Sequence, residues 1–192
     1  MESPTPACGF HRRRSGCGRH RRPDDAAHEQ PRPAVQDQGP IRGEAEPLYR
    51  RALAIDDQSY GPEHPTVARD LNNLAQLLKA TNRLEAAEPL MRRALEIDER
   101  SYGPEQPEVA RDLNNLALLL KATDRLEEAE PLSRRMLGIL LNFTRRTGHP
   151  HPHINTALAN FKAILKALGR SEAEIAARLG ALLGEYGIES SQ

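Results

Sequence analysis

The strongest constraint on this chain is a 42-residue segment that is written twice in succession. In a frame that begins at Glu44, 33 of 42 positions are identical between the first copy and the second. A third copy begins at Ala129 with AEPLSRRML and then diverges. A fixed period of this length is typical of a solenoid, in which each unit buries its apolar face by stacking on its neighbours. The period therefore predicts a repeat array with a surface for binding rather than a pocket for catalysis.

Each copy has the pattern of two amphipathic helices. In the first half of the unit, Val67, Leu71 and Leu78 recur at helical spacing. In the second half, a stripe that runs from Ala87 to Ile97 has the same period. A Tyr-Gly-Pro triplet ends the second helix, because Gly tolerates the left-handed turn and Pro cannot continue a helix. These signals predict an all-α fold with helices over residues 44–60, 65–81, 86–102, 107–123, 128–146, 152–168 and 171–186.

Proline and alanine positions refine this prediction. Pro65 and Pro107 stand at the start of the first helices, where a missing N–H has no consequence. Pro89 is compatible with the second helix only if it lies in the first turn. The small residues Ala75 and Ala87 let the two backbones of a pair approach closely.

The order of these residues resembles the tetratricopeptide repeat. The family's spacing is met by the apolar and small positions Leu71, Leu74, Ala75, Leu78, Ala87 and Ala94. The string LNNLA…AEPL.RRAL.I…YGPEHP is similar to the 42-residue, kinesin-light-chain-like branch of that family. The resemblance covers residues 44–146 strongly and residues 152–186 weakly. It implies a right-handed α-solenoid of antiparallel helix pairs and a non-catalytic module that binds other proteins.

The resemblance also implies a binding site. In this family the first helices line a concave groove that holds an extended peptide or a partner helix. Asn73 and Asn115 match a position where the family often places an Asn that hydrogen-bonds a ligand backbone. Transferred position by position, the groove-facing residues are Arg69, Asn72, Asn73, Gln76, Lys79, Arg111, Asn114, Asn115, Leu118, Lys121, Asn160 and Lys166. The alternative is that the Asn residues face solvent or bridge adjacent repeats.

The last unit departs from the repeat. Complete units are expected at residues 65–102 and 107–146, whereas 152–186 fits the template only after three extra residues. Lys162 falls where the interior copies have Ala75 and Ala117. A Lys at this position does not allow close helix contact, which suits a terminal repeat with a wetter outer face.

The array also begins irregularly, because helix 44–60 is a second helix without a first. Its apolar residues Leu48, Ala52 and Leu53 are therefore expected to be partly exposed. We expect concentration-dependent self-association through this end of the array.

Residues 1–43 are predicted to be a disordered tail, as are residues 187–192. The first segment holds eight Arg, no Lys and six Pro, with few apolar residues to offset chain entropy. Read one base out of frame, residues 29–42 permit a string like the missing first helix. The tail is therefore either authentic or the product of a shifted reading frame. Two rivals to the binding array follow: a nucleic-acid-associated protein that uses the Arg-rich tail, and a non-functional fragment of a longer repeat protein.

We expect no enzyme and no cofactor, because the sequence lacks GxSxG, HExxH, Walker-type GxxxxGK[ST] and strand-linked GxGxxG motifs. The doublets Arg50-Arg51, Arg92-Arg93 and Arg134-Arg135 are interpreted as a solvated, self-paired face, with an acidic partner or nucleic acid as the alternative.

Two sets of residues offer metal ligands. His149, His151 and His153 alternate with Pro, and CGFHRR at 8–13 is followed by CGRHRR at 17–22. We favour a loop for the first set and a disordered basic segment for the second, so no metal is predicted. Both Cys residues lie in the tail and no apolar run approaches a membrane span, which favours a cytoplasmic protein without a membrane partner.

Overall fold

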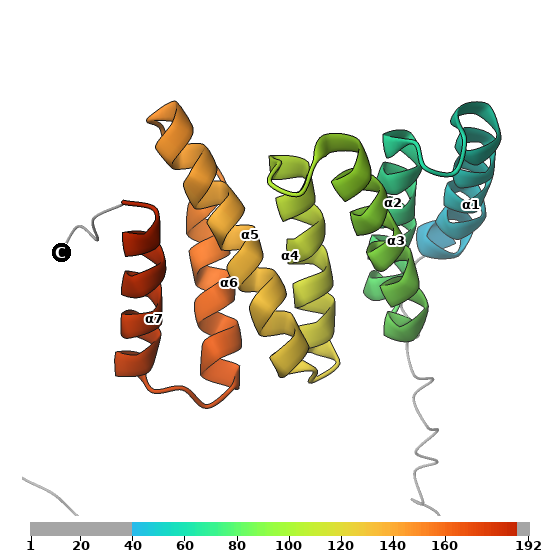
Figure 1. Cartoon of the computed structure of the whole chain (residues 1–192). Helices are drawn as coiled ribbons and strands as arrows, with labels where there is room; N and C mark the ends of the chain where they lie inside the picture. Colours follow the sequence, from blue (N-terminus) through green and yellow to red (C-terminus); the bar gives the residue numbers. More distant parts are fainter. Residues whose placement is uncertain (1–39, 188–192) are drawn as a thin grey trace, which may run out of the picture. The chain divides into compact units, whose positions relative to one another are not determined.

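The structure is a computed structural model that describes residues 40–187, and these residues form seven α-helices (Figure 1). The helices are α1 (Pro40–Tyr60), α2 (Pro65–Ala80), α3 (Leu84–Tyr102), α4 (Pro107–Ala122), α5 (Leu126–Thr147), α6 (Ile154–Ala167) and α7 (Glu172–Glu185). The described part of the chain has no strand, so the all-α prediction is confirmed. The disorder predicted for residues 1–39 and 188–192 lies outside the described residues.

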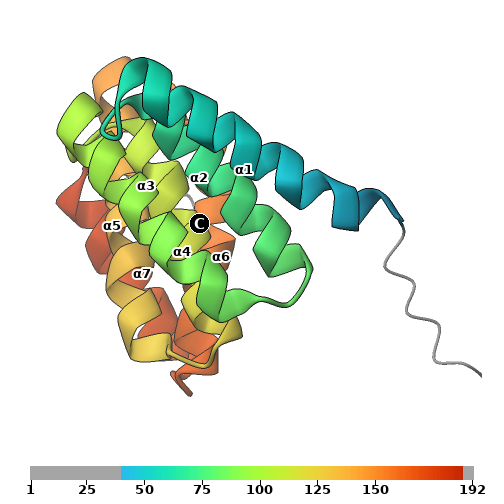
Figure 2. The same cartoon turned by 90° about the vertical axis from the view of Figure 1, so that its right-hand side faces the viewer.

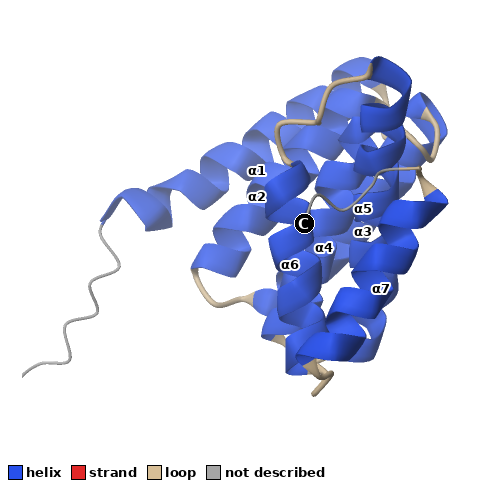
Figure 3. Cartoon of the chain, turned by 90° about the vertical axis from the view of Figure 1, so that its left-hand side faces the viewer, coloured by secondary structure: helices blue, strands red, loops and turns tan. Residues whose placement is uncertain are grey.

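The helices stack in sequence order as an α-solenoid. α2 packs along α3, and α4 packs along α5, as antiparallel pairs. Successive pairs are joined by contacts between α1 and α2, between α3 and α4, and between α5 and α6. Figures 1 and 3 show the resulting row of helices, in which each helix lies beside the one that follows it.

The core consists of the stripes that the period predicts. Val67, Leu71 and Leu78 are at most 1% exposed. The small positions Ala75 and Ala87 are fully buried, as close approach of the helices requires. One continuous cluster of buried apolar side chains then extends from α2 to α7. Burial of such side chains stabilises the fold by about 1.5–3 kcal/mol each.

Two kinds of turn connect the helices. After α1 and α3 the chain turns at Gly61 and Gly103, with φ of 89° and 93°, a region that favours glycine. This confirms the predicted helix ends. Between the two helices of a pair, Asn82 and Asp124 take φ of 60° and 59°. These residue types tolerate the left-handed conformation better than other side chains, so each three-residue turn is encoded locally.

Five of the seven helix starts differ from the prediction by one to four residues, and α1 and α3 show the reason most clearly. α1 begins at Pro40 rather than at the expected residue 44. Pro40 does not prevent the helix because it is the first helical residue, where its fixed φ suits the helix. α3 begins at Leu84, so Pro89 lies in the second turn rather than the first. Pro89 therefore leaves the Glu85 carbonyl without its usual helical donor.

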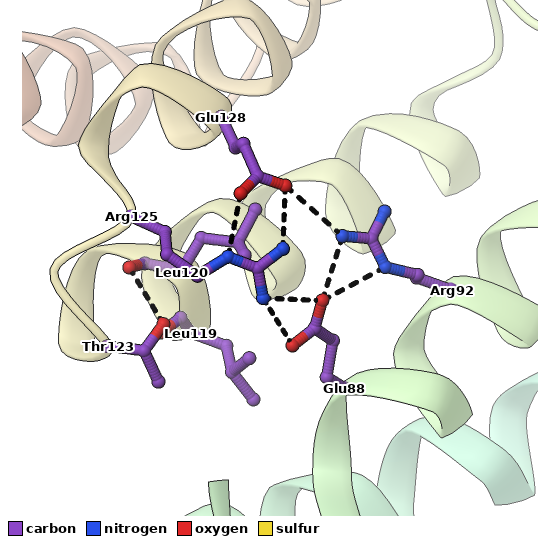
Figure 4. Close-up of polar contacts among 7 residues, drawn as sticks. All are labelled: Glu88, Arg92, Leu119, Leu120, Thr123, Arg125 and Glu128. Carbon is purple, nitrogen blue, oxygen red and sulfur yellow. Dashed lines mark hydrogen bonds and ion pairs between the residues drawn. The ribbon is translucent and has the colours of Figure 1, made fainter. Parts of the chain in front are cut away.

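Ion pairs link each second helix to the next repeat. Glu88 on α3 accepts hydrogen bonds from Arg125 at 2.7 and 2.9 Å and from Arg92 at 2.8 and 3.1 Å (Figure 4). Arg125 also bonds Glu128, and this pairing lowers the pKa of the Glu128 carboxyl. One repeat earlier, Glu46 accepts from Arg83 at 2.6 Å. We call these repeated carboxylate–arginine contacts the ion-pair ladder.

The arginine doublets belong to the same outer surface. Arg93 pairs with Asp57 and Arg135 with Glu99, in each case across neighbouring second helices. Arg134 pairs with Glu185 on α7. The prediction of a self-paired face is therefore confirmed for these residues.

The last helix packs differently from its counterparts. α6 and α7 approach closely at few positions, in contrast to the tight α2–α3 and α4–α5 pairs. Lys162 is exposed, as predicted, and stands where the tight pairs have a buried Ala. α7 instead meets α5 through Tyr186, whose hydroxyl oxygen is 2.7 Å from the position that a Cβ on Gly138 would take. A larger residue at 138 would therefore require the Tyr186 hydroxyl to shift.

Candidate functional site

The first helices of the repeats form one continuous surface. We call the accessible side of α2, α4 and α6 the A-helix face. Asn72 Nδ2 on α2 donates to Asp112 Oδ1 on α4 at 2.8 Å. Asn160 Nδ2 on α6 donates to Asn114 Oδ1 on α4 at 2.7 Å. Because these bonds connect consecutive first helices directly, polar residues of three repeats lie next to one another.

Most of the predicted groove residues lie on accessible parts of these helices. The exposed ones are Arg69, Asn73, Arg111 and Lys166. The partly buried ones are Gln76, Lys79, Asn114, Asn115, Leu118, Lys121 and Asn160. Burial lowers the pKa of Lys79, which makes its ammonium group easier to neutralise than a fully solvated one.

Some of these residues have structural partners. Asn72 is only 5% exposed and holds α4, so it is not available to a ligand and the groove prediction is wrong at this residue. Asn114 and Asn160 bond each other. Lys166 pairs with Glu172 at 3.3 Å. The alternative in which Asn residues bridge adjacent repeats therefore holds for Asn72, Asn114 and Asn160, and it leaves Asn73 and Asn115 as the candidate ligand contacts.

Buried carboxyl groups lie behind this face where α2, α3 and α4 meet, which we call the first junction. Asp98 and Asp112 are 1% and 0% exposed. Arg111 donates to both of them at 3.3 Å. Burial, followed by the neighbouring Asp112, raises the pKa of Asp98 to about 7. Burial also raises the pKa of Asp112.

The second junction, where α4, α5 and α6 meet, has a different content. In the alignment of the repeats, Leu140 stands at the position of Asp98 and Ala157 at the position of Asp112. A cavity of about 200 Å³ lies here. Its lining is Pro107, Ala110, Arg111, Asn114, Met136, Leu140, His151, His153, Thr156 and Ala157. The cavity thus combines an apolar floor with a basic and polar rim, and it adjoins two predicted groove residues.

Comparison with known proteins identifies the family. The tetratricopeptide repeat model matches residues 43–100 and again residues 83–142. The chain belongs to the tetratricopeptide repeat family. Repeats of this family generally mediate protein–protein interactions. A search of curated proteins gave no match.

Solved structures with a similar fold include kinesin-light-chain-like repeat proteins. BtubC (BKLC) from P. vanneervenii is similar with a TM-score of 0.63 and 26% identity, over 79% of this chain and 61% of that one. A putative kinesin light chain of Podosopora anserina with nearly identical repeats has a TM-score of 0.62 and 20% identity, over 78% of this chain and 70% of that one. A second crystal structure of that light chain, which carries a substitution, has the same TM-score and identity, over 75% of this chain and 68% of that one.

The histidine segment is the loop that enters the last repeat, as the sequence analysis favoured. His151 packs against Phe143 with ring centroids 5.0 Å apart, and the His153 N–H donates to His151 Nδ1 at 3.2 Å. Burial, and then His153, lowers the pKa of His151. Among residues 40–187, no group of three or more His, Cys, Asp or Glu side chains is arranged to hold a metal ion. The Cys and His residues of segments 8–13 and 17–22 lie outside this range.

Sequence reasoning missed both junctions. The buried Asp98–Asp112 pair was not anticipated, because each Asp alone resembles a solvated helix residue. The repeat alignment holds the missing signal: Asp56 and Asp70 recur as Asp98 and Asp112 and then disappear. The Asp pair is present in two copies, and both of its members are replaced by apolar residues, Leu140 and Ala157, in the third. Joint replacement of this kind indicates that the two positions face one another within the array.

Proposed function

We propose that this array is a non-catalytic adaptor that binds a peptide or a partner protein on its A-helix face. The observation that supports this most directly is the recurrence of accessible polar residues at equivalent positions of α2 and α4. Arg69, Asn73 and Lys79 return as Arg111, Asn115 and Lys121 one repeat later. This row of hydrogen-bond donors on successive first helices can bind the backbone carbonyls and acidic side chains of an extended peptide segment.

The cavity at the second junction adds an apolar component to this surface. It lies beside Arg111 and Asn114, so a segment that runs along α4 passes its mouth. A site that combines a few polar groups with an apolar hollow is the usual form of a specific binding site. No helix among residues 40–187 is long and apolar enough to cross a membrane. A cytoplasmic location and the absence of a cofactor remain predictions.

Binding on this face is tested with the Asn73→Ala/Asn115→Ala double variant. A displayed library of random peptides is selected on the wild-type array, and the enriched peptides are then measured against the variant by calorimetry. We expect affinity to fall by about tenfold or more, because each lost hydrogen bond is worth about 0.5–1.5 kcal/mol.

The matched control is Glu85→Ala/Glu127→Ala, which changes two exposed, repeat-equivalent residues on the second helices. This variant should keep the wild-type affinity. Equal affinities for all three proteins would mean that the array binds elsewhere, and the proposal would fail.

We also propose that a second copy of the chain docks on α1. Leu48 and Ile55 on this helix are 66% and 52% exposed. The equivalent positions on α3 face α2, where Ile97 is 1% exposed and Leu90 is partly buried. Leu53 packs against the core, so the exposed stripe is confined to the side away from α2. Figure 2 shows the first turns of α1 extending beyond α2.

Sedimentation at several protein concentrations tests the dimer. We expect wild-type chains to associate and the Leu48→Glu/Ile55→Glu variant to remain monomeric, because charges on the stripe cannot be buried without a partner. Tyr102→Ser, a change at an exposed large apolar residue outside α1, is the control and should associate like the wild type. A wild-type chain that is monomeric at high concentration would contradict this part of the proposal.

A further inference from the structure

The first junction contains two carboxyl groups that have more acceptor oxygens than there are hydrogen-bond donors around them. Asp112 Oδ1 accepts from Asn72 Nδ2 at 2.8 Å and from Arg111 Nε at 3.3 Å. Asp98 Oδ2 accepts from Arg111 Nη2 at 3.3 Å. The other oxygens, Asp98 Oδ1 and Asp112 Oδ2, are buried and have no donor among residues 40–187. A buried acceptor without a donor costs about 1–3 kcal/mol, more for a charged group.

The two carboxyl groups also lie close together, because the guanidinium of Arg111 donates to both of them at 3.3 Å, and each carboxyl influences the pKa of the other. Two carboxylates are both acceptors, so this contact is a hydrogen bond only when one of them carries a proton. A carboxylic acid that donates to a carboxylate satisfies one of the orphaned oxygens. Like charges at this separation in a buried site cannot both ionise without a large penalty.

The surrounding charges do not compensate two ionised groups. From α4, Arg111 supplies one positive charge, whereas Glu108 adds a negative one to the field at Asp98. Arg69 on α2 and His64, the residue before α2, line the hollow beside Asp98. Arg69 is already paired with Asp56 and Asp70, so it is committed to the preceding junction.

We propose that Asp98 and Asp112 share one proton and form a pH-sensitive contact that holds α3 against α4. With the proton in place, the pair and Arg111 together are neutral and the two helices are joined by a carboxylic acid–carboxylate bond. When the proton leaves, two negative charges face each other in the core and the contact between the repeats weakens. Because α4 also carries Arg111 and Asn115, the spacing of the A-helix face would then respond to pH near neutrality.

The other junctions supply internal controls. At the second junction, Leu140 and Ala157 occupy the equivalent positions and have no proton to lose. Between α1 and α2 the equivalent pair is Asp56 and Asp70, and burial raises the pKa of Asp70 there as well. The Asp56 side chain is 21% exposed, however, and within residues 40–187 neither carboxyl group has a buried oxygen that lacks a hydrogen-bond partner. The unsatisfied pair is therefore specific to the first junction.

The test is urea denaturation of the full chain from about pH 5.5 to about pH 8, with Asp98→Asn as the comparison. The native pair keeps a proton that the unfolded chain has released, since an unfolded Asp titrates near 3.8. Raising the pH therefore favours unfolding, by up to about tenfold in the equilibrium constant per pH unit until the native proton is lost. In the Asp98→Asn variant the new amide donates to Asp112 without titrating, so this component disappears. Subtracting the two curves removes the contributions of histidines and other groups.

Asp56→Asn is the matched control and should keep the wild-type pH dependence. Carbon-13 NMR of the aspartate carboxyl carbons in the wild-type chain provides a second readout that needs no variant. We expect one buried carboxyl signal to titrate near neutrality. Parallel denaturation curves for the wild type and Asp98→Asn would overturn the proposal. So would NMR signals that show both carboxyl groups ionised at about pH 5, well below the neutral range.

Discussion

The first and second junctions occupy equivalent positions in successive repeats, yet the first contains two buried carboxyl groups and the second contains a cavity. At the first, the buried Asp98 and Asp112 accept hydrogen bonds from Asn72 and Arg111. At the second, Leu140 and Ala157 leave a cavity of about 200 Å³. The helices around both junctions still pack by the same apolar stripes. The difference teaches that the repeat positions between helix pairs are free to carry either a polar link or a binding hollow.

The largest expected effect comes from breaking the polar pair. Asp112→Ala leaves Asp98, Asn72 and Arg111 without their shared partner and should destabilise the chain by about 3–5 kcal/mol in urea denaturation. Asp98→Leu/Asp112→Ala, which copies the second junction, should cost clearly less than the single change, because it removes both charges together. A double variant less stable than Asp112→Ala would show that the two junctions are not equivalent.

A smaller effect is expected within the helix pairs that flank the junctions. Ala75→Leu and Ala117→Leu should each cost about 1–3 kcal/mol, because added volume between tightly packed helices forces strain. Lys162→Leu changes the equivalent position of the last repeat, which is exposed, and should be close to neutral. Thermal denaturation of the three variants checks this. Equal losses at all three sites would contradict the alignment of the last repeat.

The ion-pair ladder should contribute less to the stability of the fold than the small core positions do. Arg125→Gln removes the contact with Glu88 on α3 and the local contact with Glu128 on α5, and should lower the stability only slightly, since both partners are partly solvated. The loss should shrink in high salt, which screens such pairs. Arg134→Gln, which removes one exposed pair with Glu185, is the comparison and should cost less.

The smallest expected effect is a pH dependence specific to the second junction. His151 has a pKa lowered below its usual 6.5 by burial, so the native state favours its neutral form. Its contribution to stability is therefore present above pH 6.5 and is lost as the pH falls through its native pKa. His151→Leu should weaken this acid sensitivity, whereas His149→Leu, at an exposed site, should not. Denaturation curves at falling pH compare the two variants.

The sequence determined the fold more completely than the site. The period, the apolar stripes and the Tyr-Gly-Pro stops are local signals, and they placed all seven helices within a few residues of their observed bounds. The helix starts at Pro40 and Leu84 were missed because proline restricts but does not forbid the first turns. Family resemblance then supplied the A-helix face as a prediction.

The finer features depend on contacts between repeats. Whether Asn72 meets a ligand or Asp112 is decided by the distance between α2 and α4, which no property of Asn72 itself encodes. The same holds for the cavity, since Leu140 and Ala157 are ordinary core residues in isolation. The contact of Tyr186 with Gly138 likewise depends on where α7 turns back.

The likeness of the two complete repeats has a kinetic consequence. α2 carries almost the same side chains as α4, so a folding chain offers α5 two nearly equal partners. The apolar stripes of α2 and α4 do not distinguish which of the two helices α5 joins. The short turn through Asp124 does, because it holds α5 next to α4 and closing a short loop costs less entropy than closing a long one. Fidelity of assembly in this chain thus resides in its connections, and lengthening that turn would favour exchange of helices within or between molecules.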